Sequence, residues 1–245
     1  MEDAIATLER PRVSLIVPVY NEAESLPPLM AEVEAALRGL GRCEVVLVND
    51  GSTDGSLAVM ERLREQYPKQ GIRIICLDRN YGLTTAMDAG FKAARGEFFV
   101  TLDADLQNDP ADIPRLLSYL SEYDVAIGSR TSRQDGLIKR ISSKVANAVR
   151  NWATEEDIRD VACSLKAYRA EYVRRLKLYN GLHRFLPTLL KLEGARLIEV
   201  PVNHRPRRFG VAKYHLLNRL VGPLLDLFAV RWMQKRHLRY RTEEK

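Results

Sequence analysis

The segment VTLDADLQNDP, residues 100–110, carries three aspartates within seven positions at the end of an apolar run. Carboxylates so close together repel one another unless a positive charge compensates them. Asp103 and Asp105 end a predicted strand, so that alternation along it would aim both carboxylates to one side. Two hard oxygen ligands suit Mg²⁺ or Mn²⁺, with substrate phosphates completing the shell. Gln107 is expected on the same side, where its amide could order a metal-bound water or a phosphate oxygen.

A lone D-x-D triplet is weak support for a metal site, because the triplet occurs by chance in many loops. The alternative is a strand-end turn with capping aspartates. The position of Asp103 and Asp105, directly after an apolar strand, favours the metal hypothesis. Asp109 precedes Pro110, which instead predicts the N-cap of a helix beginning in PADIPRLL.

Apolar segments that could position these carboxylates alternate with segments of helical spacing. Strands are predicted over 13–19, 44–50, 72–77, 97–103 and 124–129, and helices follow them, with Asn21 expected to cap the first. Strands that are apolar throughout indicate a parallel sheet covered by helices on both faces, an α/β fold. Ligands bind beyond the carboxyl ends of such strands. The polar residues there predict an active-site rim: Tyr20, Asn21, Glu22, Asn49, Asp50, Asp78, Arg79, Asp103, Asp105, Ser129 and Arg130.

Beyond Arg130 the pattern is less regular. It predicts a helix over 137–153, a strand-like start followed by a helix over 163–176, a helix over 181–194 and a last strand over 196–204. The chain is expected to divide into an N-terminal extension (1–11), one α/β domain (12–215) and a basic tail (216–245).

Three widely spaced cysteines show no metal or disulfide pattern, which suits a reducing cytoplasm. His183, His204, His215 and His237 show no ligand spacing and are expected to be surface or lid-adjacent polar residues.

Charge is concentrated at the C-terminal end. Residues 204–245 contain eleven Lys and Arg against three Asp and Glu, whereas the first 203 residues contain 27 against 29. This imbalance implies an anionic partner: nucleic acid, an anionic membrane or a phosphorylated substrate. No recognisable nucleic-acid-binding module accompanies it, which argues against nucleic acid. No apolar segment is long enough to cross a bilayer, and the N-terminus does not resemble a signal peptide.

The tail also contains an amphipathic stripe, with Arg219, Lys235 and Arg236 lying off it. An apolar face with Trp and flanking cations predicts an interfacial helix on an anionic membrane, and packing on the domain or in a dimer is the alternative. Gly222-Pro223 is expected to kink or split this helix. The stripe consists of Leu216, Leu217, Leu220, Val221, Leu224, Leu225, Phe228, Ala229 and Trp232.

Five linked motifs in the first 130 residues resemble the signature of family 2 glycosyltransferases, which have the Rossmann-like GT-A fold. They are VSLIVPVYNEAESL, VVLVNDGSTDGS, LDRNYGLTTAMDAGF, FFVTLDADLQNDP and VAIGSR. The later segments IKRISSKVAN, CSLKAYR and HRPRRFGVAKY are similar to the polyprenyl-phosphate branch, which contains dolichol-phosphate mannose synthases and bacterial undecaprenyl-phosphate glycosyltransferases. The resemblance covers residues 12–215, roughly.

The resemblance implies a role for particular residues. The base and ribose of a nucleotide-sugar would be held by Pro18, Tyr20, Glu22 and Asp50. The metal and diphosphate would be held by Asp103, Asp105 and Gln107. The sugar or the acceptor phosphate would meet Arg130 and Ser143, and a loop over the phosphates would contribute Arg207 and Lys213. Dolichol-type enzymes carry an arginine four residues before the serine; this chain has Lys139 there, with Arg140 beside it, so which of the two meets the acceptor phosphate is open.

Each of these residues also has a purely structural alternative. Pro18 could end a strand, Glu22 could occupy a first helical turn, and Asp50 could cap the DGS turn. The segment GVAKY could be an ordinary surface turn.

The resemblance implies an inverting, metal-dependent glycosyltransferase that moves a sugar from a nucleotide-diphosphate sugar to a polyprenyl phosphate. Such a protein is expected to be peripheral at the cytoplasmic face of the membrane. A phosphate acceptor is already ionised near neutral pH, so no strong base is expected. The alternatives are a family 2 transferase with a saccharide or glycan acceptor, and a catalytically silent nucleotide-sugar-binding protein. A nucleotidyltransferase is disfavoured because no Gly-rich phosphate loop with a lysine follows the first strand. The sugar, the base (uridine mildly favoured) and homo-oligomer formation stay open.

Overall fold

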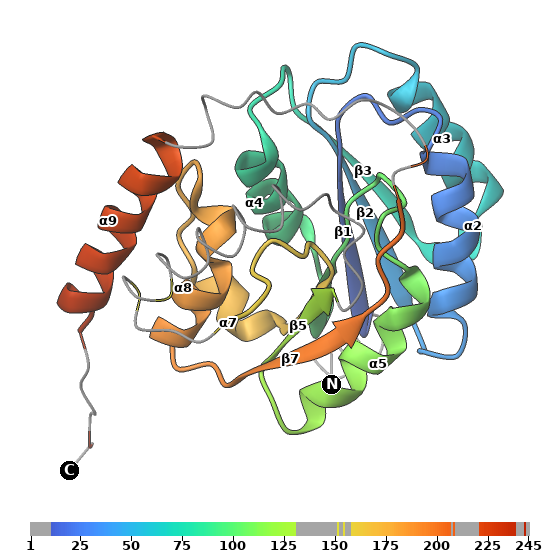
Figure 1. Ribbon diagram of the computed structural model, residues 1–245. Coiled ribbons are helices and arrows are strands. Elements are labelled where there is room, and N and C mark those ends of the chain that lie inside the picture. Colours follow the sequence, from blue (N-terminus) through green and yellow to red (C-terminus); the bar gives the residue numbers. More distant parts are fainter. Residues whose placement is uncertain are drawn as a thin grey trace.

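The computed structural model describes residues 11–130, 151, 154, 158–206, 208, 221–238 and 243. Its centre is a seven-stranded sheet with the order β3-β2-β1-β4-β6-β5-β7 (Figure 1). β6 pairs antiparallel with β4 and β5, and the other pairings are parallel. The predicted, mostly parallel sheet is therefore confirmed. The strands are β1 (Val13–Val19), β2 (Cys43–Asn49), β3 (Ile72–Cys76), β4 (Phe98–Thr101), β5 (Val125–Arg130), β6 (Lys166–Arg169) and β7 (Leu197–Val202).

Helices cover both faces of this sheet, as predicted (Figure 1). On one face pack α2 (Leu26–Leu37), α3 (Ser56–Gln66) and α5 (Ile113–Ser118), and on the other α4 (Leu83–Ala93), α7 (Ala170–Arg175) and α8 (Leu186–Leu192). Alternation along β1 shows why: Leu15 belongs to the first apolar cluster and Ile16 to the second. Short 3₁₀ segments span Pro68–Gln70 (η1), Pro110–Asp112 (η2), Tyr119–Ser121 (η3) and Leu182–Phe185 (η4).

The position of β6 is not evident from the order of the elements along the chain. Residues 163–176 were predicted to begin like a strand and continue as a helix, which β6 and α7 confirm. The register pairs Thr101 of β4 with Lys166, and Lys166 with Ile127 of β5. A lysine from a later segment thus lies in the middle of the sheet, beside the end of β4.

The loop after β1 corrects one prediction. α2 begins at Leu26 with Ser25 at the N-cap position, so Asn21 does not cap it. Asn21 has a left-handed φ of 53°, and its Oδ1 accepts a hydrogen bond from the Thr53 amide at 2.8 Å. Its side chain is instead used to join the β1–α2 loop to the β2–α3 loop, which fixes two parts of the predicted rim relative to one another.

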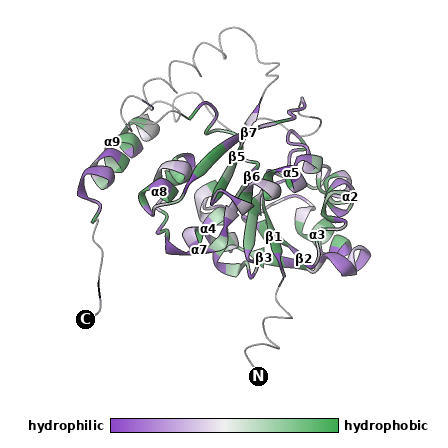
Figure 2. Ribbon diagram, turned by 90° about the horizontal axis from the view of Figure 1, so that it is seen from below, coloured by the Kyte–Doolittle hydropathy of each residue, from purple (hydrophilic) through white to green (hydrophobic). Residues whose placement is uncertain are grey.

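The tail helix α9 (Val221–Arg236) packs beside α8 at the edge of the molecule (Figures 1 and 2). Leu227 and Val230 are buried against Leu182, Phe185 and Leu189. Residues 209–220 lie outside the described part of the chain, so the expected kink or split at Gly222-Pro223 stays a prediction. None of the helices in the part of the chain that is described is both long enough and apolar enough to cross a membrane.

The opposite face of α9 carries members of the predicted stripe. Leu225, Phe228 and Trp232 are 65%, 72% and 64% exposed. The helix therefore uses a second apolar face for packing and leaves the predicted one open to solvent. The stripe residues 216, 217 and 220 lie outside the described residues, and so does the predicted helix over 137–153 except for residue 151.

Candidate active site at the carboxyl ends of the strands

The predicted rim lies at one edge of the sheet. β1, β2 and β3 run parallel, and their last residues are in register, Val19 with Asn49 and Asn49 with Cys76. β4 and β5 point the same way, because each is antiparallel to β6. The loops that follow these five strands therefore meet at the same end, which confirms the arrangement expected from the sequence.

The D-x-D segment forms a turn rather than the end of a strand. β4 ends at Thr101, so strand alternation does not orient Asp103 and Asp105, and that part of the prediction is wrong. Leu106 has a φ of 62° and is 1% exposed. Burying this side chain in the core forces the chain into a left-handed turn, which the Gln107 amide stabilises by donating to Oδ1 of Asp105 at 3.0 Å. Asp103 is half-buried and Asp105 is buried.

The donor set of this turn fits a hard divalent cation only in part. Among the described residues, no group of three or more His, Cys, Asp or Glu side chains could hold a metal ion by itself. Two carboxylates separated by one residue can supply two oxygen ligands, and Mg²⁺ commonly takes its other ligands from water and substrate phosphates. Asp103 and Asp105 thus fit Mg²⁺ or Mn²⁺ as part of a metal–diphosphate unit rather than as a closed protein cage.

Arg130, at the end of β5, is held in a fork by Asp160. Its Nε and Nη2 donate to the two carboxylate oxygens at 2.7 and 2.8 Å, and its backbone amide donates at 3.1 Å. Asp160 is 3% exposed, and its own amide donates to Oε1 of Glu199 on β7 at 3.1 Å. The guanidinium of Arg130 is thereby fixed in a defined orientation. Asp160 is not among the residues predicted from the sequence; the available signal is an acid shortly before the strand-like segment that starts at residue 163.

Lys166 supplies a buried cation close to the D-x-D turn. Its side chain lies in the sheet with 5% exposure, and Nζ donates to the carbonyl oxygen of Cys163. Burial lowers the pKa of Lys166, and the neighbouring Cys163, Asp103 and Asp160 oppose that shift. Lys166 therefore links Asp103 electrostatically to the Arg130–Asp160 pair. A charged residue inside a predicted strand was the signal that could have found it.

Arg205 connects the segment after β7 to the D-x-D turn. Its guanidinium bridges Glu32 and Asp109, each at 2.7 Å, and its amide donates to the carbonyl oxygen of Gln107 at 2.7 Å. The Gln107 side-chain nitrogen lies 3.5 Å from the carbonyl oxygen of Arg205. Asp109 also accepts from the Ala111 amide at 3.0 Å, which confirms its predicted capping role, at η2 ahead of α5.

The loop after β2 is organised by Asp50. Its carboxylate accepts hydrogen bonds from the Tyr81 and Gly82 amides at 2.8 and 2.9 Å and from the Asn80 side chain at 2.9 Å. Burial raises the pKa of Asp50, and the two amide bonds oppose that shift. A Cβ on Gly51 would lie 2.3 Å from the backbone of Arg79, so only glycine allows this close approach. Asp50 thus positions the β3–α4 loop.

The remaining predicted nucleotide residues lie around the end of β1. Pro18 and Tyr20 are half-buried. Glu22 accepts a hydrogen bond from the Ser25 hydroxyl at 2.9 Å, and its amide donates to the Ser56 hydroxyl at 2.9 Å. The predicted acceptor and diphosphate residues outside the described part of the chain are Lys139, Arg140, Ser143, Arg207 and Lys213.

His183, expected from the sequence to be a surface or lid-adjacent residue, is half-buried. It packs at the start of α4, where Nδ1 lies 2.6 Å from the Thr84 hydroxyl. Burial lowers the pKa of His183 to about 3, and the cations Arg184 and Lys166 act in the same direction. The hydroxyl of Thr84 also accepts from the Gly181 amide at 3.0 Å, so it links His183 to the backbone ahead of η4.

A family model for glycosyl transferase family 2 matches residues 14–177. The chain belongs to this family. Dodecaprenyl-phosphate galacturonate synthase of Rhizobium johnstonii is 39% identical over 241 residues, which cover 95% of this chain and 69% of the relative. Undecaprenyl-phosphate 4-deoxy-4-formamido-L-arabinose transferase of Pectobacterium atrosepticum is 40% identical over 217 residues, 88% of this chain and 66% of the relative. The family 2 chain thus spans about two thirds of the length of these relatives. Their names are those of the polyprenyl-phosphate branch that the sequence motifs resemble.

Solved structures of the GT-A type share the fold. A mannosyltransferase from Pyrobaculum calidifontis in complex with GDP-Man and Mn²⁺ aligns with a TM-score of 0.65 and 23% identity, over 90% of this chain and 64% of that one. Glucosyl-3-phosphoglycerate synthase from Mycobacterium tuberculosis, with Mn²⁺, UDP-glucose and phosphoglyceric acid, aligns with a TM-score of 0.69 and 18% identity, over 94% and 81%. The predicted GT-A architecture of this family 2 chain is therefore confirmed.

Proposed function

We propose that this protein transfers a sugar from a nucleotide-diphosphate sugar to a polyprenyl phosphate. The observation that carries the proposal is a D-x-D turn that shares the neighbour Lys166 with the oriented guanidinium of Arg130, in a chain about 40% identical to transferases named for polyprenyl-phosphate products. Carboxylates that can share a cation with a diphosphate, at the same end of the sheet as a guanidinium suited to a phosphate, match a reaction with phosphates on both substrates.

On the donor side, Asp103 and Asp105 would hold Mg²⁺ or Mn²⁺ with the diphosphate, and Gln107 would support that shell. A bound cation would stabilise the negative charge that develops on the departing nucleoside diphosphate. The base and ribose would lie against Pro18, Tyr20 and Glu22. Asp50 would contribute by holding the Asn80–Gly82 segment in place beside them.

On the acceptor side, Arg130 would orient the polyprenyl phosphate or the sugar. A phosphate oxygen attacks the anomeric carbon from the face opposite the diphosphate; the new C–O bond forms as the bond to the diphosphate breaks, which inverts the configuration. The phosphate is largely ionised at pH 7, with a second pKa of about 6, so no side chain needs to remove a proton. Ser143, Arg207, Lys213 and either Lys139 or Arg140 are proposed to complete this phosphate site.

A lipid-product assay tests the proposal. The purified chain is incubated with Mn²⁺, a polyprenyl phosphate and radiolabelled UDP- and GDP-sugars, and the products are partitioned into organic solvent. We expect one donor to yield labelled lipid that mild acid hydrolyses. A labelled product formed only on added saccharides would support the glycan-acceptor alternative. Thermal stabilisation by a nucleotide-sugar without any transfer would support a silent binding protein.

We further propose that α9 seats the protein on the cytoplasmic face of an anionic membrane, where the lipid acceptor resides. Leu225, Phe228 and Trp232 form an exposed apolar face, whereas Leu227 and Val230 hold the helix on the domain. Basic residues Lys235 and Arg236 lie in the last turn. A Trp-bearing apolar face next to cations is suited to the headgroup region of a bilayer.

Vesicle co-sedimentation distinguishes the role of the exposed apolar face of α9 from that of its packed face. Replacing both Leu225 and Phe228 with serine is expected to weaken binding to phosphatidylglycerol vesicles about tenfold or more, because two apolar side chains no longer insert. The melting temperature should change little, since both side chains are exposed in the fold. Leu227→Ala is the matched control and should lower the melting temperature while preserving vesicle binding. Unchanged binding of the double variant would refute the membrane role.

A further inference from the structure

The D-x-D turn packs against the segment that leads into β6, residues 163–166. The hydroxyl of Thr101, just before the turn, donates to the carbonyl oxygen of Ser164 at 2.6 Å. The side-chain amide of Asn108, just after the turn, donates to the Ser164 hydroxyl at 2.7 Å, and the Cys163 thiol donates to Oδ1 of Asn108 at 3.5 Å. Both ends of the turn are therefore joined to one short segment of the chain.

The side chain of Lys166 extends back along that segment toward the turn. β6 is antiparallel to β4 and Lys166 lies opposite Thr101, so the residues before Lys166 run alongside those that follow Thr101. Nζ donates to the carbonyl oxygen of Cys163, three residues earlier in the chain. The amine therefore lies at the carboxyl end of β4, where the turn begins.

The charge of this amine is enclosed within the protein. Lys166 is 5% exposed, and a hydrogen bond to a carbonyl oxygen does not neutralise it. A cation this deeply buried is stable only where carboxylates compensate it. Burial lowers the pKa of Lys166, whereas the nearby Asp103 and Asp160 favour its charged form. Lys166 thus offsets part of the negative charge of the D-x-D pair.

A fixed positive charge at this place acts in opposite directions on the two parts of the proposed ligand. It repels a divalent cation that approaches Asp103 and Asp105, and it attracts the diphosphate that accompanies the cation. Salt screens enclosed charges much less than exposed ones, so both effects persist at physiological ionic strength. The turn is therefore occupied by the cation–diphosphate pair in preference to the bare cation.

We propose that Lys166 is a specificity-determining residue whose fixed charge makes the D-x-D turn bind a divalent cation together with a diphosphate and disfavours the cation alone. Lys166 acts through Asp103 and needs no contact with either substrate. This role rests on the proposed function of Asp103 and Asp105 as metal ligands, and it involves neither the sugar nor the acceptor.

A purely structural role for Lys166 predicts a different result. If the amine only supported the turn through the Cys163 carbonyl, its removal would weaken binding of the cation and of the diphosphate alike. Removal of a charge instead strengthens binding of the bare cation and weakens binding of the diphosphate. The signs of the two changes therefore distinguish the two roles.

Two titrations measure these affinities without sugar transfer. Binding of Mn²⁺ alone to the full chain is followed by electron paramagnetic resonance of the free ion. Binding of UDP and of GDP at saturating Mn²⁺ is followed by calorimetry. Lys166→Met replaces the amine with an apolar side chain of similar length. We expect this variant to bind Mn²⁺ alone about tenfold more tightly and the nucleotide about tenfold more weakly than the parent does.

Three further variants serve as controls. Lys166→Gln also removes the charge but keeps a donor group, and gives the same test if the apolar side chain is not tolerated. Lys166→Arg keeps the charge and should bring both affinities back toward those of the parent. Thr101→Val removes the buried hydroxyl that donates to Ser164 without changing any charge. It should lower the melting temperature and leave the affinity for Mn²⁺ alone within about twofold of the parent's, because no charge is altered.

The two changes decide the role of Lys166. Tighter binding of Mn²⁺ and weaker binding of the nucleotide in the charge-removing variants would support it as a determinant of specificity. Weaker binding of both, or an unchanged affinity for either ligand, would show that Lys166 only supports the turn. The proposed metal role fails separately, if Asp105→Asn leaves the binding of Mn²⁺ unchanged.

Discussion

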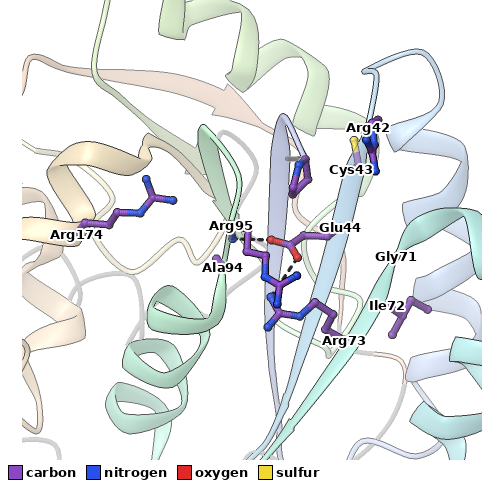
Figure 3. Close-up of a pocket in the computed structure, with 10 residues that line it drawn as sticks. Arg42, Cys43, Glu44, Gly71, Ile72, Arg73, Ala94, Arg95 and Arg174 are labelled. Carbon is purple, nitrogen blue, oxygen red and sulfur yellow. Dashed lines mark hydrogen bonds and ion pairs between the residues drawn. The ribbon is translucent and has the colours of Figure 1, made fainter. Parts of the chain in front are cut away.

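The two ends of the sheet balance their charges in opposite ways. At the carboxyl end, arginines are matched with carboxylates of the same chain: Arg130 with Asp160, and Arg205 with Glu32 and Asp109. At the amino end, the buried carboxylate of Glu44 pairs with Arg73 and also accepts from the Ser14 hydroxyl and the Arg95 backbone amide (Figure 3). The first arrangement orients cations around a turn that carries two further aspartates, whereas the second uses one carboxylate to join the starts of β1 and β2 to β3 and to the end of α4. Charge pairs at the carboxyl end thus prepare a site, and those at the amino end hold the fold together.

The largest effect is expected from the two aspartates of the turn. Asp103→Asn and Asp105→Asn should each lower sugar transfer about 10³-fold or more, because the cation that stabilises the departing diphosphate is no longer held. Initial rates of lipid-product formation at saturating Mn²⁺ measure this loss. Asp109→Asn is the matched control: it keeps a capping oxygen for the Ala111 amide but removes the charge that pairs with Arg205, and should cost about 1 kcal/mol of stability or less while retaining most activity. Near-normal rates in both turn variants would contradict the proposed metal role.

A smaller loss is expected when the carboxyl end loses its internal pairing. Asp160→Asn leaves the Arg130 guanidinium, whose side chain is 16% exposed, without its counter-charge. We expect about a hundredfold lower kcat, because the guanidinium is no longer fixed, and about 3 kcal/mol lower stability in urea unfolding. Glu199→Gln keeps an acceptor for the Asp160 amide and serves as control. A variant that is destabilised but fully active at low temperature would show that Asp160 has a structural role only.

The sequence identified the parts of the site that depend on local patterns. The apolar runs of β1 and β2, the D-x-D pair and the cap at Asp109 are each encoded within a few neighbouring residues. Asp160 and Lys166 escaped detection because their importance depends on β6 inserting between β4 and β5, a pairing of residues about 65 positions apart. Hydrophobic periodicity carries no information about such long-range order.

The turn at Asp103 is not encoded in the strand pattern, for a related reason. Its geometry is set by burial of Leu106 in the core, and not by the alternation of the strand before it. Glu44 was overlooked because a single acid in an apolar strand shows its meaning only when Ser14, Arg73 and Arg95 are seen around it.

The amino end should respond differently from the carboxyl end when its carboxylate is removed. Glu44→Gln removes the buried counter-charge of Arg73, and we expect a loss of about 2–3 kcal/mol in the free energy of unfolding. Sugar transfer should stay within about twofold, since Glu44 is separated from the D-x-D turn by the length of the sheet. Urea unfolding and initial rates of lipid-product formation measure the two effects; unchanged stability would contradict a structural role for this carboxylate.

The smallest effect concerns His183, a position near the carboxyl end where positive charge is disfavoured. Its pKa of about 3 in the folded state lies below the usual 6.5, because burial and the nearby Arg184 and Lys166 oppose protonation. Between these two pH values the unfolded chain binds a proton that the folded chain does not, so this stabilising contribution is complete above pH 6.5 and declines as the pH falls. His183→Gln should remove up to about 2 kcal/mol of the stability difference between pH 7 and pH 5, as measured by urea unfolding. His237→Gln controls for the loss of a histidine elsewhere. An unchanged pH dependence in His183→Gln would mean that the imidazole is protonated while buried, and that the carboxyl end accepts a further cation at this position.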